Sequence, residues 1–205
     1  MVNDHPGLLS DRIIRGAELS ENTHISWGSP LSTDDYAEYR DQAFLDLLGI
    51  SLQKRTLKDF WPERGPQWDA LGRTGDGTIF LVEAKSHIPE LMSHLGAKSE
   101  KSAGQIRSSL NETREYLNSR SENDWSSPFY QYANRMAHLY LLRMLNGVPA
   151  YLVFVYFLND KDMGGPSTKE EWLGAIRLLH AYLGLGRNRL KGFIIETFCD
   201  VNDLL

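Results

Sequence analysis

Two acids and one lysine have types and spacing that could do chemistry. Glu83 and Lys85 follow the apolar residues 79–82, and Asp69 stands upstream, across the turn sequence Gly75-Asp76-Gly77. Carboxylates bind divalent cations, and a lysine beside them can hold a water molecule or stabilise charge that develops on a phosphate. Together these residues indicate metal-assisted hydrolysis of a phosphate ester.

A hairpin would bring the three residues together. If a three-residue loop is centred on Asp76, Leu71 pairs with Leu81 and Asp69 falls opposite Glu83. Side chains alternate along a strand, so Asp69, Glu83 and Lys85 then share one face. Two opposed carboxylates repel each other unless a cation lies between them. The alternative is an ion pair of Glu83 and Lys85 that only decorates the strand end.

The elements that must position these residues follow from apolar periodicity, turns and caps. A helix is predicted over 32–49, with an N-cap in 32–35 and Gly49 as C-cap, and residues 1–30 are predicted to be an irregular N-terminal arm. The remaining predictions are strands at 55–60, 67–73, 78–86, 150–158 and 191–201, and helices at 90–119, 128–146 and 169–184. This order predicts one α/β domain over 1–205, with a mixed central β-sheet flanked by helices.

The motif also resembles a known family. Trp68-Asp69-Ala70, then Glu83-Ala84-Lys85 after an apolar strand, resembles the PD-(D/E)xK nuclease superfamily, and the likeness covers about residues 34–158. It implies a restriction-endonuclease-like core of a helix, a three-stranded meander, helices, a strand, a helix and a strand. Trp68 stands where the family has proline, and no Gln-x-x-x-Tyr segment assigns a subfamily.

What the resemblance implies for function is a metal-dependent nuclease. Asp69 and Glu83 would bind Mg²⁺, which Mn²⁺ could replace, together with the backbone carbonyl of Ala84. Lys85 would orient the attacking water. The implied partner is nucleic acid, with DNA the first expectation, and a homodimer stays open. The alternative is a catalytically inactive nuclease-like fold that binds nucleic acid or protein.

Further candidates lie on predicted helices. Glu38 continues a core-facing stripe, so it could complete the metal site, or it could be a solvated acid favoured by the helix dipole. Gln131, Asn134 and Arg135 share one side of a helix, where they could reach a phosphate or form a polar flank. Gln105, in the helix before, is a further candidate for substrate binding.

Composition bounds the class of protein. Hydrophobic residues make up 41% of the chain, the net charge is −5, and one cysteine excludes an internal disulfide. The acidity argues against nonspecific coating of nucleic acid through global charge, although a local basic groove is compatible with it. No signal-peptide pattern or membrane-length apolar run is visible, so we expect a cytoplasmic protein without a membrane partner.

Overall fold

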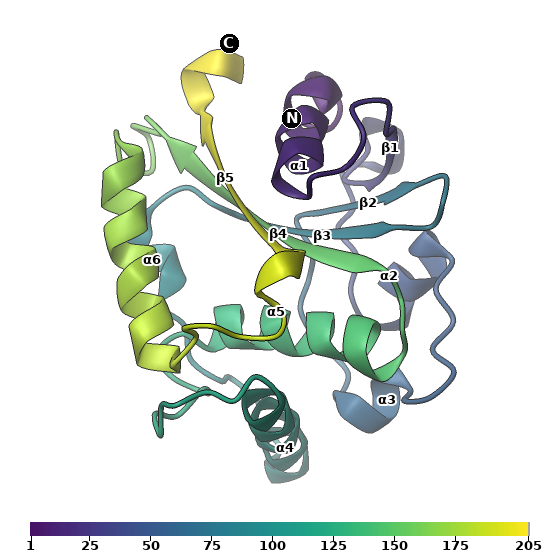
Figure 1. Cartoon of the computed structure of the whole chain (residues 1–205), viewed down its shortest axis with the longest axis vertical. Helices are drawn as coiled ribbons and strands as arrows, with labels where there is room; N and C mark the ends of the chain where they lie inside the picture. The colour runs from purple at the N-terminus through teal and green to yellow at the C-terminus, as the bar shows by residue number, and fades with distance from the viewer. Residues whose placement is uncertain (205) are drawn as a thin grey trace.

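The computed structural model describes residues 1–204, which form a five-stranded mixed sheet with the order β1-β2-β3-β4-β5 (Figure 1). Strands β1 to β3 pair antiparallel, and β3, β4 and β5 pair parallel. The predicted class, a mixed α/β fold, is confirmed. The strands are β1 (Ile25–Ser29), β2 (Ala70–Thr74), β3 (Ile79–Lys85), β4 (Ala150–Leu158) and β5 (Ile194–Asp200).

Within residues 1–204, six α-helices cover the two faces of the sheet unequally. Helix α1 packs on one face, where Leu9, Ile13 and Ile14 meet side chains of β3, β4 and β5. The other helices supply the larger core on the opposite face, visible below the sheet in Figure 1. The helices are α1 (Pro6–Gly16), α2 (Asp41–Leu48), α3 (Leu57–Phe60), α4 (Glu100–Tyr116), α5 (Tyr130–Tyr140, continued by a π-helical turn at Leu141–Leu145) and α6 (Lys169–Leu183).

The predicted hairpin register is confirmed over β2 and β3. Ala70 pairs with Val82 and Leu71 with Leu81, and the turn at 75–77 closes with the Thr74 amide donating to the Thr78 carbonyl at 2.9 Å. The regular ladder ends at Ala70. Asp69 lies in a bend just outside it, where its amide donates to the Val82 carbonyl at 3.2 Å.

Two predictions for the first part of the chain are wrong. Residues 1–30 are not irregular, because they contain α1 and the edge strand β1. Residues 55–60 are not a strand, because Thr56 caps α3: its hydroxyl accepts from the Asp59 amide at 3.1 Å. The first strand of the meander is therefore β1, which pairs with β2 across an excursion that contains α2 and α3.

The helix predicted over 32–49 is shorter than expected. A 3₁₀ turn at Ser32–Asp34 is followed by Asp35 and Tyr36 with positive φ, and α2 starts only at Asp41. Glu38 therefore lies in a non-helical segment beside Tyr39, which forms an isolated antiparallel bridge with Trp68. Gly49 is the left-handed C-cap, as predicted.

The later elements agree better with the sequence. The strand predicted at 150–158 coincides with β4, and α6 ends at the left-handed Gly184. The helix predicted over 90–119 splits instead into a 3₁₀ turn at Ile88–Leu91, an irregular stretch and α4. Within residues 1–204, no helix is both long and apolar enough to pass through a lipid bilayer.

Candidate active site

Strand β3 carries two charged residues at the end of a buried segment. Ile79 and Leu81 pack in the core on the α5 side of the sheet, and alternation places Glu83 and Lys85 on that same side. Glu83 is 1% exposed and Lys85 is 9% exposed. A carboxylate at this depth must be paired, because its desolvation otherwise costs several kcal/mol.

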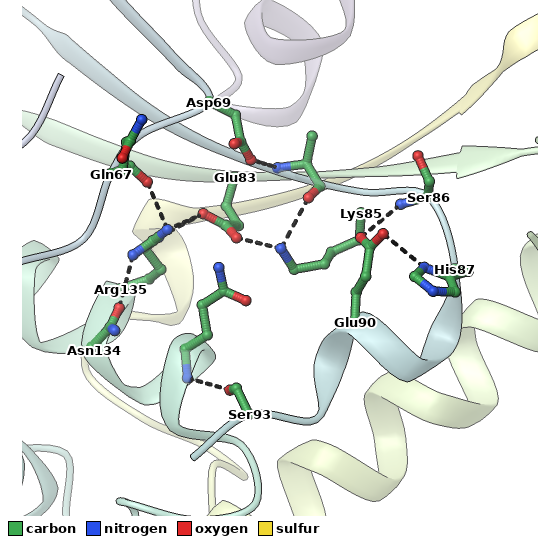
Figure 2. A network of polar contacts seen from close by, with 12 residues as sticks. Gln67, Asp69, Glu83, Lys85, Ser86, His87, Glu90, Ser93, Asn134 and Arg135 are labelled. Atoms are coloured by element: carbon green, nitrogen blue, oxygen red, sulfur yellow. Dashed lines mark hydrogen bonds and ion pairs between the residues drawn. The ribbon is translucent and has the colours of Figure 1, made fainter. Parts of the chain in front are cut away.

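Glu83 is paired on both of its oxygens (Figure 2). Its Oε2 accepts from Arg135, with the oxygen 2.6 Å from Nε and 2.5 Å from Nη2. Its Oε1 accepts from the Lys85 ammonium, which also donates to the Ala84 carbonyl oxygen at 3.0 Å. Two cations from two different elements therefore offset one buried carboxylate.

Arg135 has a complete set of partners. Nη1 donates to Asn134 Oδ1 at 3.0 Å and Nη2 donates to the Gln67 carbonyl at 2.7 Å. The guanidinium also lies 4.8 Å from the centre of the Trp68 ring, a cation–π distance. Asn134 and Arg135, predicted as substrate contacts, thus lie beside the acids and support Glu83.

Asp69 reaches the same end of β3 from the bend before β2. Its Oδ2 accepts from the Ala84 amide at 2.6 Å. Burial, reinforced by the negative charge of Glu83, raises the pKa of Asp69 to about 6, although the Ala84 hydrogen bond, Lys85 and Arg135 act in the opposite direction. Because burial is the larger cause, the raised pKa shows that the ionised form of Asp69 loses hydration that its partners do not fully replace, and a bound cation would favour that ionised form.

An open pocket of about 610 Å³ exposes this cluster to solvent. Of the predicted site residues, it brings together Asp69, Glu83, Ala84, Lys85, Glu38, Gln131, Asn134 and Arg135. Glu38 is exposed at the wall, where its Oε2 accepts from Gln67 Nε2 at 3.0 Å. It reaches the pocket from a non-helical segment, not from the first helix as predicted.

Gln105 does not belong to the pocket, and its prediction as a substrate contact is not supported by its position. Its Nε2 donates to the Lys58 carbonyl at 2.8 Å, because this part of α4 packs against α3. Asp41, three residues after Glu38, has a structural role. Its carboxylate accepts from the amides of Arg64 and Gly65 at 3.0 and 2.8 Å, which holds the loop that forms one wall of the pocket.

Some pocket residues carried no signal in the sequence. Glu90 lies in the 3₁₀ turn after β3, where its oxygens contact His87 Nδ1 at 2.7 Å and the Ser86 amide at 3.1 Å. Its closeness to the end of β3 was the only available hint. The Gln67 carbonyl could not have been found, because a backbone atom leaves no trace in residue type.

The oxygen atoms around Lys85 suit a divalent cation. Within residues 1–204, no three or more His, Cys, Asp or Glu side chains form a metal-binding group. Asp69, Glu83 and Ala84 nevertheless line the same pocket, and Mg²⁺ commonly takes one or two carboxylates with water and phosphate oxygens. The ammonium of Lys85 already places one positive charge against Glu83 Oε1 and the Ala84 carbonyl.

Comparisons of the chain with protein-family models, with curated proteins and with solved structures give no match. What the protein does is therefore inferred from its own residues and their geometry.

Proposed function

We propose that the chain is a Mg²⁺-dependent nuclease of the PD-(D/E)xK type that hydrolyses phosphodiester bonds, with DNA as the expected substrate. One observation carries the proposal: Asp69, Glu83 and Lys85 meet at one open pocket, at the adjoining ends of two paired strands.

The architecture supports the same class of protein. An antiparallel meander of β1, β2 and β3 is followed by helices and by β4, parallel to β3. This arrangement is compatible with the proposed restriction-endonuclease-like core, in which the motif acid and lysine end the third strand of the meander. Here that strand is β3, which ends at Lys85.

The residues that would hold the metal are Asp69, Glu83 and the Ala84 carbonyl, with Glu38 available from the facing wall of the pocket. Bound Mg²⁺, or Mn²⁺ in its place, supplies Lewis-acid polarisation of the phosphate and a lowered pKa for a bound water. Lys85 contributes the positive charge next to the reacting phosphate and can orient the attacking water. Gln131 and Arg64 also line the pocket and would contact the nucleic-acid backbone.

A second candidate function has a specific observation in its favour. Both oxygens of Glu83 are already bound by cations of the protein, which is how a purely structural buried carboxylate would be satisfied. A nuclease-like fold that binds nucleic acid or protein without cleaving anything would look the same in this respect.

Cleavage of supercoiled plasmid separates the two candidates. The wild-type chain is expected to nick or linearise plasmid with Mg²⁺ or Mn²⁺ and to be inactive in EDTA. Asp69→Asn and Lys85→Ala should each lower the rate by about 100-fold or more, because each removes a group that acts on the reacting phosphate or its metal. Lys101→Met, which removes an exposed lysine of α4, is the matched control and should cleave normally.

Absence of cleavage of DNA and of RNA by the wild-type chain with either metal would overturn the nuclease proposal. If binding to nucleic acid persisted in that case, the binding module would be the better description.

A further inference from the structure

The oxygen atoms of the site differ in how firmly they are already bound. Glu83 Oε2 receives Arg135, Glu83 Oε1 and the Ala84 carbonyl receive Lys85, and Asp69 Oδ2 receives the Ala84 amide. Asp69 Oδ1 accepts no hydrogen bond from residues 1–204. A metal ion can bind only those oxygens whose present partners can leave.

Arg135 cannot leave at low cost. Its Nε, Nη1 and Nη2 all have acceptors, its guanidinium faces Trp68, and it is 3% exposed. Arginine stays charged at any relevant pH, and its planar fork is suited to fixed hydrogen bonds of this kind. Its withdrawal would leave Glu83 Oε2 without a partner at depth and break the contact with the Gln67 carbonyl.

Lys85 can leave. Its ammonium has two acceptors, Glu83 Oε1 and the Ala84 carbonyl, and it lines the open pocket of about 610 Å³. A lysine carries its charge on a flexible four-carbon stem, so the ammonium can turn into the pocket while the stem stays packed. The two oxygens that Lys85 would release are two of the proposed metal ligands.

We propose that the Lys85 ammonium and a single divalent ion compete for Glu83 Oε1 and the Ala84 carbonyl, while Arg135 holds Glu83 Oε2 throughout. The inference rests on the proposed metal site and adds how that site is gated and how many ions it takes. Once displaced from these oxygens, Lys85 would turn toward the pocket, where the phosphate and the attacking water would lie. In the metal-free site, Lys85 pairs with Glu83; in the metal-bound site, the same lysine would face the substrate.

The number of ions follows from the oxygens that remain. Asp69 Oδ1, Glu83 Oε1 and the Ala84 carbonyl would offer one ion three protein ligands, and water and phosphate oxygens would supply the rest. A second ion would need more carboxylate oxygens. Glu90 lies against His87 Nδ1 at 2.7 Å and accepts from the Ser86 amide, and Glu38 is exposed at the wall, where it would complete the shell of the same ion.

The test measures ion binding in the absence of nucleic acid. Mn²⁺ titrations followed by electron paramagnetic resonance should give one ion per wild-type chain. Lys85→Met removes the competing charge and keeps the stem, so its affinity for Mn²⁺ should rise on the order of tenfold or more. Lys101→Met again is the control, with unchanged affinity. Circular dichroism checks folding, and Lys85→Gln replaces Lys85→Met if the latter does not fold.

Equal or weaker Mn²⁺ binding by the Lys85 variant, two ions per wild-type chain, or no binding at all would each overturn the inference. Its failure can be told from failure of the nuclease proposal. If the wild-type chain cleaves plasmid but Lys85→Met gains no affinity for Mn²⁺, only the proposed competition between Lys85 and the ion is refuted. If the wild-type chain binds one ion and cleaves nothing, and Lys85→Met binds Mn²⁺ more tightly, only the nuclease proposal is refuted.

Discussion

Asp69 is the residue at which the proposed chemistry and the stability of the fold oppose each other. Its carboxyl has a pKa of about 6 because it is buried close to Glu83. A pKa raised above the unfolded value means that the folded chain favours the protonated group. The stability contributed by this group is fully present below about pH 4 and is lost as the pH rises through about 6. At neutral pH the ionised carboxylate is therefore a burden in the absence of metal.

Asp69→Asn should relieve that burden. An amide is neutral, and its oxygen can still accept from the Ala84 amide, so the free energy of unfolding at pH 7 in EDTA should rise on the order of 2 kcal/mol. Urea denaturation at pH 7 and at pH 4.5 measures the effect, and the gain should shrink at the lower pH. Asp162→Asn, at an exposed loop position, is the control and should change little. A variant less stable than wild type at pH 7 would show that the carboxylate is stabilising.

At the scale of single residues, the sequence predicted the positions of the charged residues of β3 but not the partner of Glu83. Glu83 and Lys85 could be placed on one face because strand alternation is a local rule, and the Gly-Asp-Gly turn fixed their register with β2. The partner of Glu83 could not be derived. Arg135 is 52 residues away on a helix, and only tertiary packing decides whether it meets a phosphate or a buried acid.

At the scale of elements, strong local signals predicted well. β4 is a continuous apolar run, and α6 has a capping box of Thr168 and Glu171 at its start and Gly184 at its end. The predictions for segments with weak local signals were wrong. β1 is five residues long and contains Gly28, so its pairing with β2 left little trace in the sequence. The run 55–60 is too short for periodicity to separate a strand from a helical turn.

The loop between β4 and α6 supports the end of β3 at one glycine. A Cβ at Gly165 would clash with the carbonyl oxygen of Ser86, the residue that follows Lys85. Gly165→Ala should therefore lower the free energy of unfolding by about 1–3 kcal/mol and displace the chain next to the site. Differential scanning calorimetry gives the first effect, and the Mn²⁺ titration gives the second.

A second glycine-to-alanine substitution, in α6, should raise the free energy of unfolding instead of lowering it. Gly174 lies on the exposed face of α6 with no heavy atom near a Cβ at that position. Gly174→Ala should raise stability by about 0.5–1 kcal/mol through helix propensity alone and leave Mn²⁺ binding unchanged. Equal effects of the two glycine substitutions would refute a specific support of β3 by this loop.

At the scale of the whole molecule, the sheet separates the pocket on one face from a second hydrophobic core on the other. The pocket lies on the side of α5, and α1 covers the opposite face with a core of its own. Damage to that second core should therefore act on stability without altering the site's geometry. The segment predicted as an irregular arm contains α1, which covers this face of the sheet, and the edge strand β1.

Ile13→Ala tests this separation. Ile13 is 0% exposed, so its truncation should lower the free energy of unfolding by about 2–4 kcal/mol. Mn²⁺ affinity per folded chain, measured well below the melting temperature, should stay as in wild type. Arg15→Ala, at an exposed position of the same helix, is the control. A large change in Mn²⁺ affinity in Ile13→Ala would show that the two faces are coupled.

The ion pair of Glu83 and Arg135 also has a consequence for biosynthesis. A growing chain exposes β3 many residues before α5, and until α5 docks, Glu83 has no guanidinium partner and is best left in water. Contacts over such sequence separations form late in folding because the loop between them must first close. A nascent chain released as far as β3 therefore has both acids and the lysine but no assembled site. If the protein cleaves nucleic acid, its activity therefore appears only after α5 has been synthesised and has docked on the sheet.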